Sequence, residues 1–224
     1  MKGIIMQPDS VRAILAGRKT QTRRLVKIPR WSGNDEEIEL HYEPKFGDHW
    51  PCVIAESSGC LAPIPTRYRV GEVLYIKESW GIGGARLVDP CLNYRADGAQ
   101  HPMIACADFD WHVPAQGDRL LGINDKTLLA VKDGWRSAMY MPEWASRIHL
   151  EITEVRCQRV QEITEEDAEA EGIDGNDALV GQIVNPYRTA YADLWDRINP
   201  KQPWESDPFV FSYTFRRLSD RPIE

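Results

Sequence analysis

The stretch that decides the fold is Gly17-Arg18-Lys19-Thr20-Gln21-Thr22-Arg23-Arg24. It brings a glycine, a lysine, two threonine hydroxyls and three arginines together within eight residues. The preceding residues 8–16 predict a short helix whose start is capped by Ser10 or Asp9 and whose apolar residues share one face. A glycine suits the left-handed turn that ends such a helix. We therefore expect an ordered element to hold the polar run in place.

Positive charge is concentrated in the same region. Between residues 10 and 34 the chain has seven basic side chains and no acidic one, although its net charge is −7. Such a local patch attracts anions. A pI near 5.3 argues against broad wrapping of duplex DNA, which needs many phosphate contacts. It is compatible with a single nucleotide or a short RNA in a local basic cleft.

Composition indicates a globular, cytoplasmic protein. The 224 residues are 42% hydrophobic and include eight tryptophans, which suits one enlarged domain with a sizeable core. No apolar run approaches the ~20 residues of a membrane span, and residues 1–6 lack the apolar core of a signal peptide. Five cysteines at irregular spacings fit reduced thiols better than a disulfide framework.

The remaining elements point to an α+β domain. We expect strands at residues 2–6, 72–77, 148–160 and 209–215, the third with a break in alternation near Val155 and the last with one aromatic face in the core. Helices are expected at residues 164–171, with Thr164 as the N-cap, and from Pro186 to the stop at Asn199-Pro200.

Two irregular insertions interrupt this single domain of residues 1–224. Residues 28–68 are rich in proline and acidic side chains, and we expect a surface insertion there with one strand at 38–42. Residues 84–134 form the second irregular region. Within it, the run from Asn93 to Gly98 predicts the end of a strand followed by a turn.

The opening stretch resembles the signature of the ASCH family, a branch of the PUA-like superfamily. The pattern Gly-x-Lys-x-x-Thr-x-Arg falls on Gly17, Lys19, Thr22 and Arg24. Residues 70–80 are similar to the family's Gly-Asp-x-Leu strand, and residues 141–148 with the closing aromatic strand resemble larger ASCH-like proteins of bacteriophages and prophages. The resemblance implies a PUA-like small β-barrel flanked by helices.

A lysine beside a hydroxyl is one way to activate a weak nucleophile. If burial or neighbouring arginines lower its proton affinity, the Lys19 amine can act as a base. One ASCH subgroup removes the acetyl group from N(4)-acetylcytidine with a lysine, a threonine and a helix-end glutamate. The resemblance places these roles on Lys19, Thr22 and Glu171. Lys19 would activate water or Thr22, Glu171 would assist the leaving amine, and backbone amides after Gly17 would stabilise the oxyanion.

Further residues are candidates for substrate binding through charge or base stacking. They are Arg18, Arg23, Arg24, Lys77, Glu78, Trp80, Tyr94, Arg95, Trp144 and Arg147. Plainer interpretations stand beside these roles. Aromatic residues beside turns commonly fill a core, Lys19 and the arginines would only bind a phosphate, and Glu171 would be a solvated helix glutamate. Tyr94 in particular would then pack inward in a surface hairpin, and Thr22 would hydrogen-bond the turn.

No cofactor is expected, because the chain has no phosphate loop, dinucleotide fingerprint or serine elbow. Two sets of histidines and cysteines are considered as zinc ligands, but neither has paired Cys-x-x-Cys spacing, so we expect no metal site. The first set is His49, Cys52 and Cys60, and the second is Cys91, His101, Cys106 and His112.

The function expected from these residues is recognition of a nucleoside, nucleotide or short single-stranded RNA. The most specific version of this expectation is that the protein hydrolyses an acylated cytidine. Three alternative functions remain. The first is a binding module for RNA or modified bases without catalysis, the second is a ribonuclease, and the third is a phage protein that binds a host protein through its insertions. The sequence leaves the oligomeric state open.

Overall fold

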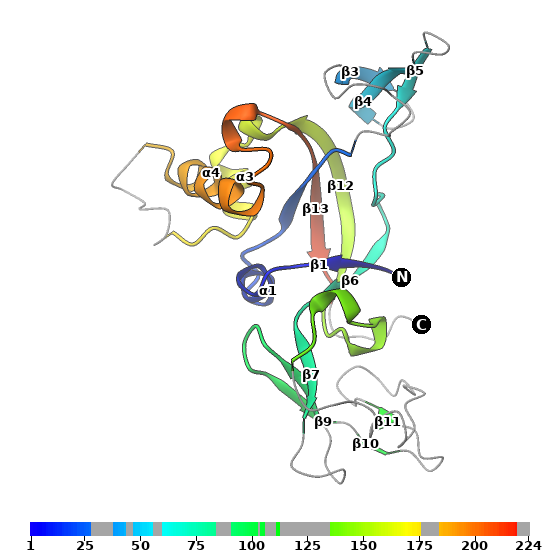
Figure 1. Cartoon of the computed structure of the whole chain (residues 1–224), viewed down its shortest axis with the longest axis vertical. Coiled ribbons are helices and arrows are strands. Elements are labelled where there is room, and N and C mark those ends of the chain that lie inside the picture. Colours follow the sequence, from blue (N-terminus) through cyan, green and yellow to red (C-terminus); the bar gives the residue numbers. More distant parts are fainter. Residues whose placement is uncertain are drawn as a thin grey trace. The chain divides into compact units, whose positions relative to one another are not determined.

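The computed structural model describes most of the chain, in nine segments (Figure 1). These are residues 1–27, 38–43, 47–55, 60–83, 91–102, 104–105, 111–112, 135–175 and 184–218. Residue contacts divide the chain into two compact units. The first unit comprises Met1–Gly17, Val73–Glu151 and Arg216–Glu224, and the second comprises Arg18–Glu72 and Ile152–Phe215. The predicted single domain with two insertions stays a prediction.

The mixed α+β class is confirmed. Five strands form one sheet in the order β1-β6-β12-β13-β2. Their bounds are β1 Lys2–Ile5, β2 Gln21–Leu25, β6 Val73–Lys77, β12 His149–Arg159 and β13 Phe209–Arg217. In the described part of the chain this order has two ends, β1 and β2, so no closed barrel is detected.

The first unit contains α1 (Pro8–Leu15) and the β1, β6 and β12 pairings. Strand β1 lies parallel to β6, and the start of β12 lies antiparallel to β6 with Leu150 opposite Leu74. A second sheet, in the order β7-β8-β9, consists of β7 Trp80–Gly83, β8 Cys91–Tyr94 and β9 Gln100–Pro102. Short 3-10 helices follow at η3 (Ala138–Tyr140) and η4 (Glu143–Ala145).

The second unit contains α3 (Glu165–Ala170) and α4 (Pro186–Ile198), which pack against each other. Strand β13 lies antiparallel to β2, with Ser212 opposite Arg23 and Thr214 opposite Gln21. An apolar core of Val160, Ile163, Ala168, Tyr191, Trp195 and Val210 joins these helices to the strands. Short 3-10 helices lie at η5 (Val160–Glu162) and η6 (Trp204–Ser206).

The helix before the signature begins differently from the prediction. Its N-cap is Gln7, which makes no side-chain cap, so neither Ser10 nor Asp9 caps the helix. Pro8 occupies the first helical position, where its missing N–H leaves one donor fewer to satisfy. The predicted left-handed turn at Gly17 is confirmed by its φ of +74°.

Replacing Gly17 with alanine should lower the free energy of unfolding by about 1–2 kcal/mol, the cost of a left-handed conformation for a residue with a Cβ. The cost is conformational, because no heavy atom lies within 4 Å of the added Cβ. Chemical denaturation measures it, and Ala16→Ser at the adjacent exposed position is the control. An alanine variant as stable as the wild type would contradict the turn described here.

Both predicted insertions contain more regular structure than expected. The strand predicted at 38–42 is confirmed as β3 (Ile38–Glu43), but β4 (Gly47–Ala55) and β5 (Cys60–Pro63) extend it into an antiparallel sheet. The prolines within and at the end of these strands masked their strand character in the sequence. The second region contains β8 and β9, and also β10 (Ile104–Ala105) and β11 (Trp111–His112). Residues 28–37, 44–46, 56–59, 84–90, 103, 106–110 and 113–134 of these regions lie outside the described part of the chain.

The long strands lie at their predicted positions, and more of their side chains are buried than expected. Along β12, burial moves from Leu150 and Ile152 to Cys157, which confirms the predicted break in alternation. Along β13, Phe211, Tyr213 and Phe215 are buried as predicted and Phe209 is half-buried, but Val210 and Ser212 on the opposite face are also buried. The predicted N-cap at Thr164 is confirmed, since its side chain accepts from the Asp167 amide. No described helix is long and apolar enough to span a membrane.

Candidate functional site

The second unit brings Lys19 and Glu171 into direct contact. Lys19 follows the glycine turn and precedes β2, and Glu171 is the C-cap of α3. The Thr20 amide donates to the Ala170 carbonyl at 2.8 Å, which ties the signature to the end of this helix. The Lys19 Nζ then lies 2.6 Å from Glu171 Oε2 and 2.5 Å from the Glu171 carbonyl oxygen. Both side chains are buried, at 4% and 5% exposed.

Arg23 connects this pair to a second carboxylate. Its Nη1 donates to Glu171 Oε1 at 3.2 Å and to Gln21 Oε1 at 2.6 Å, and its Nη2 donates to Asp167 Oδ2 at 2.7 Å. The guanidinium also lies 5.9 Å from the centre of the Tyr191 ring. The Arg23 side chain is 0% exposed, so it holds protein groups and does not face solvent.

The pKa of Lys19 is lowered from its ordinary value. Burial is the main cause, because it disfavours the charged ammonium. Contact with Glu171 opposes this effect, and the positive charges of Arg24 and Arg23 add to it. Burial also raises the pKa of the Tyr191 hydroxyl, and the nearby Glu171 carboxylate raises it further. Burial beside two arginines thus lowers the affinity of this amine for a proton, although a carboxylate contacts it.

Thr22 lies on the other face of its strand. Alternate residues of a strand point to opposite faces, and Thr22 pairs with Tyr213 while Arg23 pairs with Ser212. Because Arg23 faces Asp167 and Glu171, the alternation directs Thr22 away from these carboxylates. Of the three predicted catalytic residues, the structure therefore joins Lys19 to Glu171 and separates Thr22 from them by the plane of the sheet.

The outer part of the signature keeps two exposed arginines, Arg18 and Arg24. Arg18 Nη1 lies 3.1 Å from Asp174 Oδ2, and both side chains are about half exposed. Two of the backbone amides near the turn are already occupied, because the Gly17 and Thr20 amides donate to carbonyl groups of the protein. Neither amide supplies the oxyanion contact that we expected.

The other seven predicted binding residues lie in the first unit. Among them, Arg147 and Glu78 form a buried pair with two contacts, from Nε to Oε1 at 2.9 Å and from Nη2 to Oε2 at 3.0 Å. Arg147 also donates to both carboxylate oxygens of Asp97. Burial raises the pKa of Glu78, whereas the hydrogen bonds from Arg147 lower it in part.

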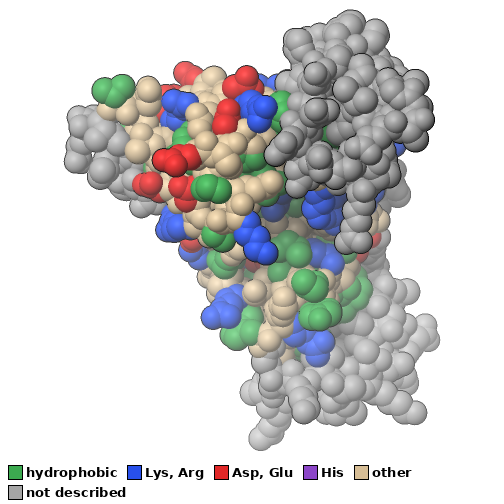
Figure 2. Space-filling model, turned by 45° about the horizontal axis from the view of Figure 1, so that its top comes forward, with side chains coloured by type: hydrophobic (Ala, Val, Ile, Leu, Met, Phe, Trp, Pro, Cys, Tyr) green, Lys and Arg blue, Asp and Glu red, His purple; other side chains and the backbone are tan. Residues whose placement is uncertain are grey.

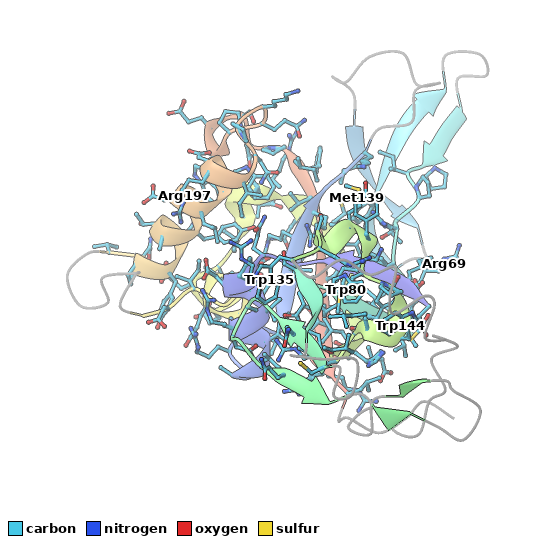
Figure 3. All side chains as sticks on the ribbon, turned by 60° about the horizontal axis from the view of Figure 1, so that its bottom comes forward. Arg69, Trp80, Trp135, Met139, Trp144 and Arg197 are labelled. Carbon is cyan, nitrogen blue, oxygen red and sulfur yellow. The ribbon has the colours of Figure 1, made fainter. Side chains whose placement is uncertain are left out.

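Most of these residues pack inside the unit. Tyr94 and Trp80 are 0% and 3% exposed, which confirms the inward-packing interpretation of Tyr94. Figure 3 labels Trp80 and Trp144, whose rings meet edge to face with centroids 5.6 Å apart. Arg147 lies 4.1 Å from the centre of the Tyr94 ring. These contacts give the cluster a structural role.

Two cationic residues of the first-unit set remain at its surface. Lys77 is half-buried, and its Nζ donates to the Met139 carbonyl at 2.9 Å. Arg95 is exposed on the turn after β8, and its backbone amide donates to the Ser79 carbonyl at 3.0 Å.

Replacing Arg147 with methionine should destabilise the protein by about 3–5 kcal/mol, because it leaves Glu78 buried without its cation. The deficit should shrink as the pH falls. A carboxylic acid whose folded-state pKa exceeds its unfolded value binds protons preferentially when folded, so protonation then favours the folded variant. Denaturation at pH 8 and pH 5 measures both effects, with Arg95→Met as the exposed control. A deficit equal at both values would contradict the proposed burial of charge.

The sequence analysis did not identify Asp167, Gln21 and Asp97 as site residues. Asp167 precedes Glu171 by four residues, and this spacing on a helix places both on one face. That signal was present in the sequence. Gln21 precedes Arg23 by two residues on one strand face, but only the register of β13 shows what that face meets. Nothing local marks Asp97 as a partner of a residue fifty positions away.

No three metal-ligating side chains gather among the residues that the structure describes. Cys106 lies outside those residues, as do the other side chains of the two sets weighed as zinc ligands, except for Cys91. Cys91 is half-buried, and its thiol donates to Asn93 Oδ1 at 3.4 Å.

Comparisons with known proteins give little more. No family model matches the chain, and no curated protein matches it. Among solved structures, the chain is similar to the crystal structure of protein EF3133 from Enterococcus faecalis V583, described with the family model DUF984. The two share 11% identity with a TM-score of 0.37, over 97% of this chain and 76% of that chain. A TM-score this low does not assign the chain to the family of that protein. The class established for this chain is therefore a mixed α+β protein.

Proposed function

We propose that the chain is an ASCH protein of PUA-like fold that hydrolyses the acyl group of an acylated cytidine, such as N(4)-acetylcytidine. The observation that carries this proposal is the buried contact between Lys19 Nζ and Glu171, in surroundings that lower the pKa of the lysine. A base in contact with a proton carrier is what amide hydrolysis requires.

The geometry of Lys19 fits the role of a base. A neutral amine has two N–H donors and one lone pair, and two acceptors lie within hydrogen-bonding distance of Nζ. Donation to both acceptors leaves the lone pair to take a proton from water. Since Thr22 lies on the opposite strand face, water is the nucleophile that we favour over the threonine hydroxyl.

The proposed reaction has a closed balance. Lys19 removes a proton from water, and the hydroxide oxygen bonds to the acyl carbon. The proton passes from Lys19 to Glu171 and from there to the exocyclic nitrogen as the bond between that nitrogen and the acyl carbon breaks. Cytidine and a carboxylic acid leave, and the acid releases its proton to solvent. Arg18 and Arg24 are the exposed cations that would attract the phosphate of a nucleotide form.

Surface charge favours a small substrate over a long RNA. Acidic side chains gather around α3 and α4 (Figure 2). Exposed members are Glu166, Glu169, Asp193, Asp196 and Glu205. Phosphate backbones bind where counterions are released by basic groups, so this acidic surface would repel an extended strand.

The test is to incubate the purified protein with N(4)-acetylcytidine and to follow cytidine and acetate by chromatography. Turnover supports the proposal. A folded protein that releases neither product removes the amidohydrolase.

The second candidate is a binding module without chemistry. The completeness of the ion pairs around Lys19 favours it, since a fully paired buried lysine also serves a purely structural role. Binding of cytidine derivatives measured by calorimetry would separate the two. Binding that survives Lys19→Met, is lost in Arg24→Ala and occurs without turnover would select the module.

A further inference from the structure

We propose that Arg23 is a positioning residue that compensates the charge of Glu171 so that Lys19 can stand neutral beside it. This inference rests on the proposed function, and it replaces the role in substrate binding expected from the sequence. It starts from the burial of Arg23, whose side chain is 0% exposed and whose two terminal nitrogens both donate to protein acceptors.

The carboxylate of Glu171 is shared between Arg23 and Lys19. Oε1 accepts from Arg23 at 3.2 Å, and Oε2 accepts from Lys19 at 2.6 Å. The arginine thus fixes the rotation of the carboxyl group and aims one oxygen at the amine. A planar guanidinium does this better than a lysine, because its donors are held in a rigid fork.

The ion pairs of the cluster explain how Arg23 acts on Lys19. Arg23 contacts both Asp167 and Glu171, whereas Arg156 contacts Asp167 and also lies 3.6 Å from Glu154. Glu171 therefore already has a cation at Oε1, which reduces its need for a charged Lys19 at Oε2. Burial and the positive charge of Arg23 both lower the pKa of Lys19.

The other charged and titratable groups near the cluster belong to different elements. Arg24 on β2 adds positive charge that opposes the ammonium, and the Tyr191 hydroxyl on α4 lies near Glu171. Arg18 and Asp174 form an exposed pair with each other. None of these groups bridges both carboxylates, whereas Arg23 does.

The cross-strand neighbour of Arg23 makes no side-chain hydrogen bond with it. Arg23 Nε and Ser212 Oγ are both buried without a hydrogen-bond partner, although the two residues face each other across β2 and β13. The guanidinium is therefore held from its two terminal nitrogens, on the side of the carboxylates. That arrangement is what a residue that positions Glu171 requires.

The experiment compares Arg23→Met with Arg23→Lys. Without the guanidinium charge, Lys19 is the remaining cation in contact with Glu171, so its pKa should rise by about one unit or more. The acidic limb of the activity profile should move to higher pH by the same amount, so kcat at pH 7 should fall about tenfold while KM changes little. Arg23→Lys keeps the charge and should restore most of the profile. Arg23→Gln, which removes the charge but keeps two N–H donors, provides the same test if the methionine variant does not fold.

Arg159→Met is the matched control. Arg159 is in the same unit, donates to the Asp207 carbonyl at 2.9 Å and lies 3.8 Å from the centre of the Phe209 ring. Its loss should lower stability without moving the pKa of Lys19.

NMR titration of the Lys19 side chain reads the same pKa without any substrate. A shift in the NMR titration without turnover in any variant would support the role of Arg23 and refute the proposed hydrolysis. An unchanged pKa of Lys19 in a folded variant that lacks the guanidinium charge would overturn the inference.

Discussion

Replacing Lys19 with methionine should reduce the rate of acyl-cytidine hydrolysis by about 10²–10⁴-fold, the usual contribution of a general base. Methionine has nearly the volume of the lysine side chain, and Glu171 keeps its contact with Arg23, so the fold should survive. Rates measured at saturating substrate are compared with those of Lys201→Met, which removes an exposed lysine of the same unit. A Lys19→Met variant with wild-type turnover would contradict the assigned base.

The same variant should change how stability depends on pH. A lysine whose pKa is lowered in the folded state binds fewer protons when folded than when unfolded. The contribution of Lys19 to stability therefore improves as the pH rises from its folded pKa towards 10.5, the ordinary value of a lysine. Lys19→Met should lose this gain, and denaturation curves at several alkaline pH values measure it.

Replacing Glu171 with alanine should lower the free energy of unfolding by about 3–5 kcal/mol, the cost of breaking a buried ion pair on one side. The loss leaves the Arg23 guanidinium buried without this carboxylate and removes an acceptor of Lys19. The penalty should therefore exceed that of Lys19→Met, in which Glu171 keeps its contact with Arg23.

Glu169→Ala is the control for Glu171→Ala, because Glu169 is exposed on the same helix and should change stability by less than about 0.5 kcal/mol. Chemical denaturation measures both variants. Equal effects at positions 169 and 171 would contradict the burial of the Glu171 charge.

Local patterns predicted the elements that carry the site. The glycine turn at Gly17, the N-cap at Thr164 and the helix end at Glu171 depend on short-range chemistry, and each lies where the sequence indicated. The approach of Lys19 to Glu171 spans some 150 positions, and it followed from a family resemblance and from no local signal.

Other features depended on long-range packing, which one sequence does not encode locally. Arg23 reads as an exposed cation in a basic run, and only the register of β2 against β13 and the position of α3 show that it is buried. Trp80, Tyr94 and Arg147 have the residue types of a binding surface, but their contacts with each other place them in a core. The strands β4 and β5 were missed because proline argued against them.

The measurement that tests the central claim most directly is the pKa of Lys19 in the wild-type protein. Labelled lysine side chains can be titrated by NMR, and Lys19→Met assigns the signal by its absence. The account predicts a midpoint below 10.5 that rises when Arg23 becomes methionine. A midpoint at or above 10.5 would show a permanently charged structural lysine, and it would contradict the proposed base.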